Sequence, residues 1–269
     1  MSNLELLKKL IKIESISPND NGCFDVIKQQ FDGLDFSFEE TNYKNISNLI
    51  ITNGDSKNKT FCFLGHTDVV PPGPESEWSV PPFSGEIIDN KIYGRGAADM
   101  KGGVACFISA LKEFLCEYKD PSFNIMVLLN SNEEGKLENG KVDRVINEMI
   151  DKDKFIDFCL IGEPSSSKKV GDVIRIGRRG SLSGNLKVYG IQGHVAYPKQ
   201  ALNPILGIGK TLEELKNMEW DRGNENFEPT SFQVSNIKSG TGAENVVPGV
   251  LEMTFNFRFS PESSPDRLK

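Results

Sequence analysis

Residues 60–68 have the sequence TFCFLGHTD, an apolar run that ends in a histidine and an aspartate. A short apolar run rich in aromatic residues predicts a buried β-strand over 60–64. His66 then lies at the carboxyl end of that strand, where open α/β sheets build their binding sites. A lone His-x-Asp pair is weak evidence, because such a histidine is more often a hydrogen-bonded structural residue than a metal ligand. The function therefore depends on what the neighbouring strands carry.

Similar apolar runs recur along the first part of the chain, with amphipathic segments between some of them. The predicted strands cover 48–52, 60–64, 124–129 and 157–161. The predicted helices cover 4–13, 23–34, 102–117 and 142–150, and a capping box of Ser2 and Glu5 opens the first of them. This alternation predicts an α/β catalytic domain with a mostly parallel sheet over residues 1–177.

The pattern changes from Arg178 onward. Residues 181–189 and 250–259 alternate polar and apolar side chains, as strands with one solvent-exposed face do. With a helix at 204–215 and a strand at 231–237, the order matches the first four elements of a ferredoxin-like α+β unit. We expect residues 178–269 to form a second, inserted domain of this kind, which is incomplete because two elements are missing.

The last residues of the chain look like the start of a helix. Ser264 and Pro265 form a helix-start signal, and only four residues follow them. A helix of one turn is not stable by itself in water. We therefore expect a longer parent protein, whose C-terminal catalytic segment is absent from this chain.

Composition narrows the classes of partner. The chain has 269 residues, 38% of them hydrophobic, a formal net charge of -7 and a sequence pI near 5.1. An acidic surface argues against nucleic acid and anionic membranes, and no apolar run approaches the ~20 residues that a membrane span needs. The N-terminus has the pattern of a helix and not of a signal peptide. A small molecule is the expected partner.

The cysteines give a prediction about location. The five cysteines form no CxxC pair, and Cys62 and Cys159 lie in apolar strand-like runs. We expect all five to be small buried hydrophobic residues of a protein in a reducing cytoplasm. They are Cys23, Cys62, Cys106, Cys116 and Cys159.

Acidic residues occupy the places equivalent to His66. Asp99 precedes a predicted helix, Glu133 and Glu134 follow the strand at 124–129, and Glu163 follows the strand at 157–161. Each one alone is more often a turn residue or a helix cap. Four carboxylates at one sheet edge are unfavourable unless cations neutralise them. Two Zn²⁺ ions would balance the four charges and could hold a hydroxide for hydrolytic attack.

The spacing also suggests roles within this set. Asp99 is the natural bridge between two metals. Adjacent side chains on an extended chain point in opposite directions, so Glu134 or Glu133 can bind metal while the other acts as a general base. Asp68 fits the carboxylate that orients the ring of His66.

Four motifs, GHTDVVPPG, GRGAADMKGG, NSNEEG and IGEPS, resemble the dinuclear zinc aminoacylase and carboxypeptidase superfamily, and the resemblance extends over nearly the whole chain. It implies that His66 and Glu163 bind one zinc, that Glu134 binds the other, that Asp99 bridges them and that Glu133 is the base. Co²⁺ or Mn²⁺ could replace Zn²⁺, because oxygen and imidazole ligands accept all three ions. The family's last histidine ligand has no counterpart here.

Residues 176–198, 229–249 and 255–260 resemble the desuccinylases of this superfamily more than its acetylornithine deacetylases. The resemblance implies hydrolysis of N-succinyl-LL-2,6-diaminopimelate, a small dicarboxylic amide, to succinate and LL-2,6-diaminopimelate. It also implies that His194, by itself an ordinary surface histidine, stabilises the oxyanion in the active site of a partner subunit. That role requires a homodimer formed through residues 178–269.

Substrate-binding residues are predicted in the second domain. Arg178 and Arg258 could each bind a substrate carboxylate through two hydrogen bonds, although isolated surface arginines are common. By resemblance, Ser181, Tyr197 and Asn245 also bind substrate. The alternatives are a related deacylase or dipeptidase with the same metals, or a dimerising or metal-binding fragment without catalysis.

Overall fold

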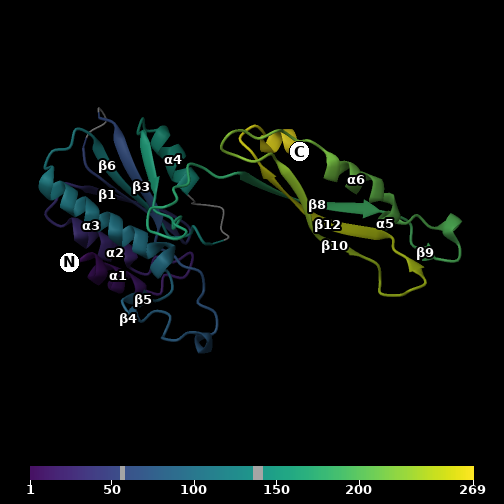
Figure 1. Cartoon of the computed structure of the whole chain (residues 1–269), viewed down its shortest axis with the longest axis horizontal. Helices are drawn as coiled ribbons and strands as arrows, with labels where there is room; N and C mark the ends of the chain where they lie inside the picture. The colour runs from purple at the N-terminus through teal and green to yellow at the C-terminus, as the bar shows by residue number, and fades with distance from the viewer. Residues whose placement is uncertain (55–57, 136–141) are drawn as a thin grey trace. The chain divides into compact units, whose positions relative to one another are not determined.

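The computed structural model describes residues 1–54, 58–135 and 142–269, and they form two compact units, Met1–Asp172 and Val173–Lys269 (Figure 1). The sequence predicts a catalytic role for residues 1–177 and a dimerisation role for residues 178–269. Both roles stay predictions. Within the described ranges, every helix is too short or too polar to cross a membrane.

A five-stranded sheet forms the centre of the first unit, in the order β1-β2-β6-β3-β7. The strands are β1 Ser37–Tyr43, β2 Ile46–Thr52, β3 Thr60–His66, β6 Asn124–Asn130 and β7 Phe158–Ile161. β3 runs parallel to β6 and β7, but β2 runs antiparallel to β1 and β6. The sheet is therefore mixed: the predicted parallel arrangement holds for β3, β6 and β7, and β2 runs in the opposite direction to its neighbours. A tight hairpin at Lys44, where φ is 59°, makes β1 and β2 antiparallel.

The helices of the first unit lie close to their predicted positions. α3 Gly102–Glu117 and α4 Val142–Ile150 have the predicted bounds, and α1 Asn3–Ile11 begins at the predicted capping box of Ser2 and Glu5. α2 Cys23–Lys28 is shorter than predicted and continues only as a 3₁₀ turn to Phe31. Asp32, whose ψ is 125°, ends the helical conformation, and Gly33 follows it with a φ of 81°. A separate hairpin pairs β4 Glu86–Ile88 with β5 Lys91–Tyr93.

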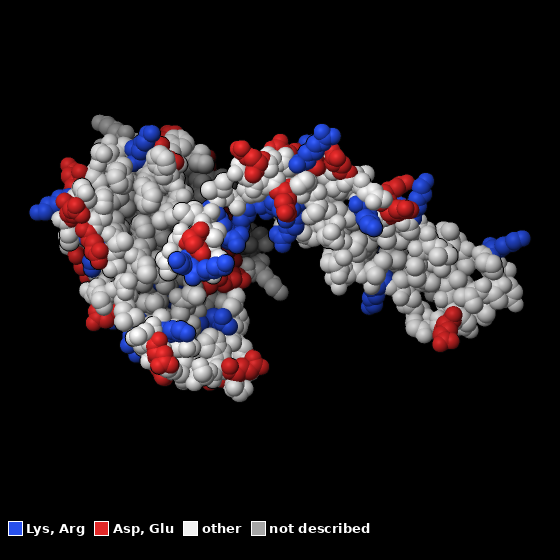
Figure 2. Space-filling model, viewed as in Figure 1, with Lys and Arg blue, Asp and Glu red and all other residues white. Residues whose placement is uncertain are grey.

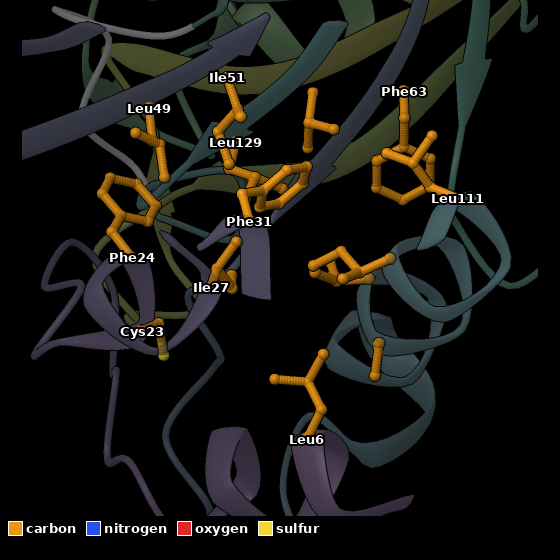
Figure 3. Packing of buried hydrophobic residues seen from close by; sticks show 14 of the residues in the cluster. Leu6, Cys23, Phe24, Ile27, Phe31, Leu49, Ile51, Phe63, Leu111 and Leu129 are labelled. Atoms are coloured by element: carbon orange, nitrogen blue, oxygen red, sulfur yellow. The ribbon is translucent and has the colours of Figure 1, made fainter. Parts of the chain in front are cut away.

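Hydrophobic side chains fill both faces of the sheet. On one face, α1, α2 and α3 pack against alternate residues of β2, β3 and β6, and Figure 3 shows Phe31, Leu49 and Leu129 in this cluster. The ring of Phe63 stacks on that of Phe107 of α3, with centroids 4.1 Å apart. On the other face, α4 packs against Ile50 of β2, Cys62 of β3, and Met126 and Leu128 of β6. These layers hold the carboxyl ends of the parallel strands in place.

Only two of the five cysteines are buried. Cys23 and Cys62 are buried as predicted, but Cys106, Cys116 and Cys159 are exposed. The first two of these lie on α3, and Cys159 lies on β7, which forms the edge of the sheet and whose four residues are all exposed. The prediction of five buried cysteines is therefore wrong for three of them.

The second unit contains an antiparallel three-stranded sheet in the order β10-β12-β8. The strands are β8 Gly180–Tyr189, β10 Ser231–Ser239 and β12 Val250–Phe259, each close to a predicted strand. The predicted helix is divided at Ile208 into α5 Pro204–Gly207 and α6 Gly209–Asn217, and it packs over Leu251 and Met253. The last element is α7 Pro265–Leu268, which follows Ser264 as its N-cap.

Charged side chains of both signs are mixed over the surface. In Figure 2, lysines and arginines are interspersed with aspartates and glutamates on the face shown of each unit. A nucleic-acid-binding surface instead carries clusters of lysines and arginines.

Candidate active site

Three neighbouring parallel strands carry most of the predicted metal ligands. His66 is the last residue of β3, Glu133 and Glu134 follow β6, and Glu163 follows β7. Because β6, β3 and β7 are adjacent and parallel, their carboxyl ends lie at one edge of the sheet. Asp99 lies in the segment Ala97–Lys101 just before α3, at a kink where its own backbone is not helical (φ -122°, ψ 105°).

The structure brings these side chains into two groups that share His66. One group contains His66, Glu133 and Glu134, and the other contains His66, Asp99 and Glu163. Within each group the potential ligand atoms lie within 4.8 Å of one another. Imidazole nitrogen and carboxylate oxygens are ligands for Zn²⁺ and for other divalent ions, so this donor set fits a two-metal centre.

The ring of His66 is held in one orientation by its own turn. Nδ1 lies 2.9 Å from the backbone oxygen of Asp68, so a protonated Nδ1 would donate to that carbonyl. Nε2 then remains free as a ligand and lies 3.2 Å from Asp99 Oδ1 and 3.5 Å from Glu163 Oε1. The carboxylate of Asp68 is farther from Nδ1, at 3.6 Å. The residue predicted to orient the ring does so chiefly through its backbone.

The carboxylate of Asp68 makes other contacts. Asp68 is fully buried, and its Oδ1 accepts the backbone N–H of Glu133 at 3.1 Å. Its Oδ2 accepts the N–H of Glu134 at 3.2 Å and the hydroxyl of Ser17. Asp68 thus connects the turn that carries His66 to the turn that carries the two glutamates. Ser17 was not predicted, because a lone serine in a loop gives no signal.

Glu133 and Glu134 do not diverge as the sequence suggested. Both carboxylates have an oxygen within 4.8 Å of the other and of His66. The chain bends at these residues and is not extended, and both of their N–H groups point to Asp68, so the alternation of a strand does not apply. The division of roles between ligand and base stays a prediction.

The proximity of these carboxylates affects their protonation. Burial raises the pKa of Glu134, and the negative charge of Asp99 raises it further despite the opposing effect of His66. Burial also raises the pKa of Glu163, and His66 opposes this shift while Asp99 adds to it. Both shifts reflect negative charge gathered in a partly desolvated place, which divalent cations would relieve.

Two buried residues next to Asp99 hold its turn in place. Lys101 is fully buried, and its Nζ donates to the backbone oxygens of Leu10 and Ile13 at the end of α1, each at 2.8 Å. Met100 is also fully buried, and its Sδ lies 3.2 Å from the backbone N of His66. Neither residue was predicted from the sequence. The signal available was a lysine directly before an apolar helix.

Two glycines make room for Met100 between the strands. A Cβ atom on Gly65 or on Gly162 would lie 2.7 Å from the terminal methyl group of Met100. Such a contact is too short, so a larger residue at either position would displace Met100. The side chain of Met100 therefore lies against Gly65, just before His66, and against Gly162, just before Glu163.

In the second unit, part of the predicted substrate-binding set lies at one end of the sheet. Ser181 of β8 pairs with Arg258 of β12, and the amide of Asn256 donates to the Ser181 hydroxyl at 3.0 Å. Arg178 lies just before β8 and is exposed, as is Arg258. These side chains are accessible to a ligand.

The rest of the set lies at the other end. His194 of β9 Gly193–His194 pairs with Val246 of β11 Val246–Val247, and its ring centroid is 5.8 Å from that of Tyr197. The backbone oxygen of Asn245 accepts the N–H of Val195 at 3.0 Å. His194, Tyr197 and Asn245 are exposed. Eight residues of β8 separate the two ends, which corresponds to about 26 Å along the strand.

Comparison with curated proteins finds close relatives over almost the full chain. A succinyl-diaminopimelate desuccinylase from Methylococcus capsulatus is 49% identical over 266 residues, which cover 99% of this chain and 70% of the relative. An enzyme of the same name from Alkalilimnicola ehrlichii is 48% identical with the same coverage.

Solved structures show the same fold at lower identity. An M20-family metallo-carboxypeptidase from Sulfolobus solfataricus superposes with a TM-score of 0.64 at 20% identity, covering 100% of this chain and 73% of that one. An aminopeptidase from Bacillus cereus has a TM-score of 0.67 at 17% identity and covers 99% and 68%. The model of peptidase family M20/M25/M40 matches residues 62–263. This chain belongs to that family.

Proposed function

We propose that this protein hydrolyses the amide bond of N-succinyl-LL-2,6-diaminopimelate and releases succinate and LL-2,6-diaminopimelate. The observation that carries the proposal is the 47–49% identity to enzymes named succinyl-diaminopimelate desuccinylase over nearly every residue of the chain. The two ligand groups that share His66 supply a site suited to that hydrolysis.

The metal centre would consist of two Zn²⁺ ions, or Co²⁺ or Mn²⁺ in their place. His66 and Glu163 would hold one ion, Glu134 the other, and Asp99 would bridge them. When bound, the ions would polarise the amide carbonyl and make a water molecule more acidic. A structural relative, described as a dinuclear metal-binding peptidase of the M20 family from Bacillus subtilis, has a TM-score of 0.59 at 12% identity.

Glu133 would move the proton. Its carboxylate is exposed and lies close to both His66 and Glu134, so it can reach a water molecule at the metal centre. It would accept a proton from the attacking water and deliver it to the nitrogen of the leaving amine. Asp68 would keep Glu133 in place through the backbone N–H that it accepts.

The second unit would bind substrate and complete the site in a homodimer. Arg178, Arg258 and Ser181 lie at or near the Gly180 end of β8 and would bind substrate carboxylates. His194 of β9, with Tyr197 and Asn245 nearby, follows the opposite end of β8, which lies about 26 Å along that strand from the first end. The two sets of residues would therefore not contact the same small molecule in one chain. We infer that these three residues act in the active site of a partner subunit, where His194 would stabilise the oxyanion.

A substrate comparison tests the proposal. The 269-residue chain, loaded with Zn²⁺, is incubated separately with N-succinyl-LL-2,6-diaminopimelate, N-acetylornithine and a dipeptide, and the released amine is quantified. We expect turnover of the succinyl substrate to exceed that of the other two. Preference for acetylornithine or the dipeptide would replace the proposal with a related deacylase or dipeptidase.

Zinc quantification on the same samples separates the remaining alternative. A chain that binds zinc and dimerises but hydrolyses none of the three substrates would be a non-catalytic fragment.

A His194→Ala chain mixed with a Glu133→Gln chain tests the shared site. If His194 acts across the dimer, the mixture regains activity that neither variant has alone, because one of its two active sites has both residues.

A further inference from the structure

Two cysteines lie side by side on adjacent strands. Cys62 of β3 and Cys159 of β7 are direct partners in the parallel ladder, so their side chains project from the same face of the sheet. Neighbouring strands lie ~4.8 Å apart, within the ~4.4–6.8 Å between Cα atoms that a disulfide bond spans. The two thiols are also close enough for a hydrogen bond between their sulfur atoms.

The two thiols differ in their access to solvent. Cys62 is fully buried among Ile50, Met126 and Leu128, beneath α4, whereas Cys159 is exposed at the edge of the sheet. A reagent in solution can therefore meet Cys159 first, and Cys62 lies directly behind it.

The hydrogen bond makes the exposed sulfur the more reactive one. Because the thiol of Cys62 can donate to the sulfur of Cys159, the thiolate of Cys159 is stabilised and its pKa falls to about 7, although partial burial opposes this. The same hydrogen bond and the burial of Cys62 raise the pKa of Cys62. At neutral pH, Cys159 is the nucleophile and Cys62 keeps its proton.

We propose that Cys159 and Cys62 form a dithiol site that reacts with low-molecular-weight disulfides. The Cys159 thiolate attacks one sulfur of the disulfide, forms a mixed disulfide and expels the other half as a thiolate. Cys62 then gives up its proton to the solvent, attacks the sulfur of Cys159 and releases the second half as a thiolate. The protein loses two hydrogens, and one small disulfide is reduced to two thiols.

The disulfide bond between Cys62 and Cys159 would connect two strands that lead to predicted metal ligands. Cys62 lies four residues before His66, and Cys159 lies four residues before Glu163. The new covalent link would therefore join β3 to β7 about 13 Å from the site edge. The remaining cysteines lie elsewhere: Cys23 is buried, which raises its pKa to about 11, and Cys106 and Cys116 lie on α3.

The experiment uses the reduced 269-residue chain and 5,5′-dithiobis(2-nitrobenzoate). We expect two nitrothiobenzoate ions per chain in a fast phase and a product lighter by two hydrogens, before Cys106 and Cys116 react. The higher thiolate fraction of Cys159, partly offset by lower nucleophilicity, predicts a reaction about threefold faster than that of an ordinary exposed thiol. Peptide mapping without reduction should recover Cys62 linked to Cys159.

Variants identify the role of each sulfur. In Cys62→Ser, one ion should be released in the fast phase and the adduct should remain on Cys159; in Cys159→Ser the fast phase should vanish. Cys106→Ser with Cys116→Ser is the matched control and should retain the fast phase. If the native chain keeps a stable adduct on Cys159, or if Cys159 reacts no faster than Cys106, the proposal is wrong. Peptide mapping of the native chain decides this even if a variant fails to fold.

Discussion

Oδ2 of Asp68 accepts the backbone N–H of Glu134 at 3.2 Å, and Oδ1 of the same carboxylate accepts the N–H of Glu133 at 3.1 Å. One buried side chain thus fixes the segment that carries a predicted ligand and the predicted base. The backbone oxygen of Asp68 meanwhile faces Nδ1 of His66. A change at Asp68 should therefore affect metal binding and proton transfer together.

We expect Asp68→Asn to weaken zinc binding about 10- to 100-fold, because the amide replaces one acceptor with a donor that faces a backbone N–H. Turnover should fall as well, even at saturating zinc, since Glu133 loses its fixed position. Competition with a chromophoric chelator measures the affinity. Asp25→Asn, at an exposed residue of α2, is the control and should change neither quantity. Unchanged zinc affinity in Asp68→Asn would contradict this role.

The strands and helices around the site could be predicted from local patterns. The apolar run before His66 and the helix after Asp99 have strong hydrophobic signals, and both formed as predicted. β1 was not predicted, because its residues, SFEETNY, are mostly polar and it pairs on one side only. The antiparallel direction of β2 also depends on tertiary pairing, which single-sequence periodicity does not contain.

The composition of the site was easier to predict than its supporting contacts. Charge crowding at successive strand ends identified His66, Asp99 and Glu163, which the structure brings together. The contacts of Asp68 with two backbone N–H groups, and of Lys101 with α1, join segments 65 to 91 residues apart. No local rule predicts such contacts, because the partners are backbone atoms.

Lys101→Met should disturb the turn that carries Asp99. The variant loses both hydrogen bonds to the end of α1 and leaves the oxygens of Leu10 and Ile13 with fewer donors. We expect a loss of about 1–3 kcal/mol in the free energy of unfolding, measured in urea. Zinc affinity should fall about 10-fold or more, because Asp99 would be less well positioned.

The control for Lys101→Met is Ile27→Val, a substitution in the same core. It should cost about 0.5–1.5 kcal/mol in unfolding free energy and leave zinc affinity unchanged. Equal losses of zinc affinity in both variants would show that Lys101 acts only through general stability.

Glu133→Gln separates the base from the ligands. If Glu133 only transfers protons, turnover of the succinyl substrate should fall about 10²- to 10⁴-fold, while two zinc ions per chain remain bound. Elemental analysis of the dialysed variant gives the zinc content. Loss of zinc would instead make Glu133 a ligand, which its place beside His66 and Glu134 allows.

Asp221 should make the stability of the second unit depend on pH at the acidic end. Desolvation alone would raise its pKa, but hydrogen bonds from the hydroxyl and N–H of Thr230 and from the N–H of Gly223 outweigh it and lower the pKa to about 2. A lowered pKa means that the ionised form stabilises the folded state. This contribution is complete above the ordinary value of 3.8 and is lost as the pH falls toward 2.

We expect Asp221→Asn to lower the unfolding free energy by about 1 kcal/mol at pH 7, after allowance for solvent screening, and by progressively less between pH 4 and pH 2. Trp78 lies in the first unit and Trp220 in the second, where its ring centroid is 4.7 Å from that of Phe257. Urea unfolding in a Trp78→Phe background therefore reports on the second unit. Asp266→Asn, at an exposed residue, is the control. A difference that stays constant from pH 7 to pH 2 would show that the Asp221 charge is not what stabilises this unit.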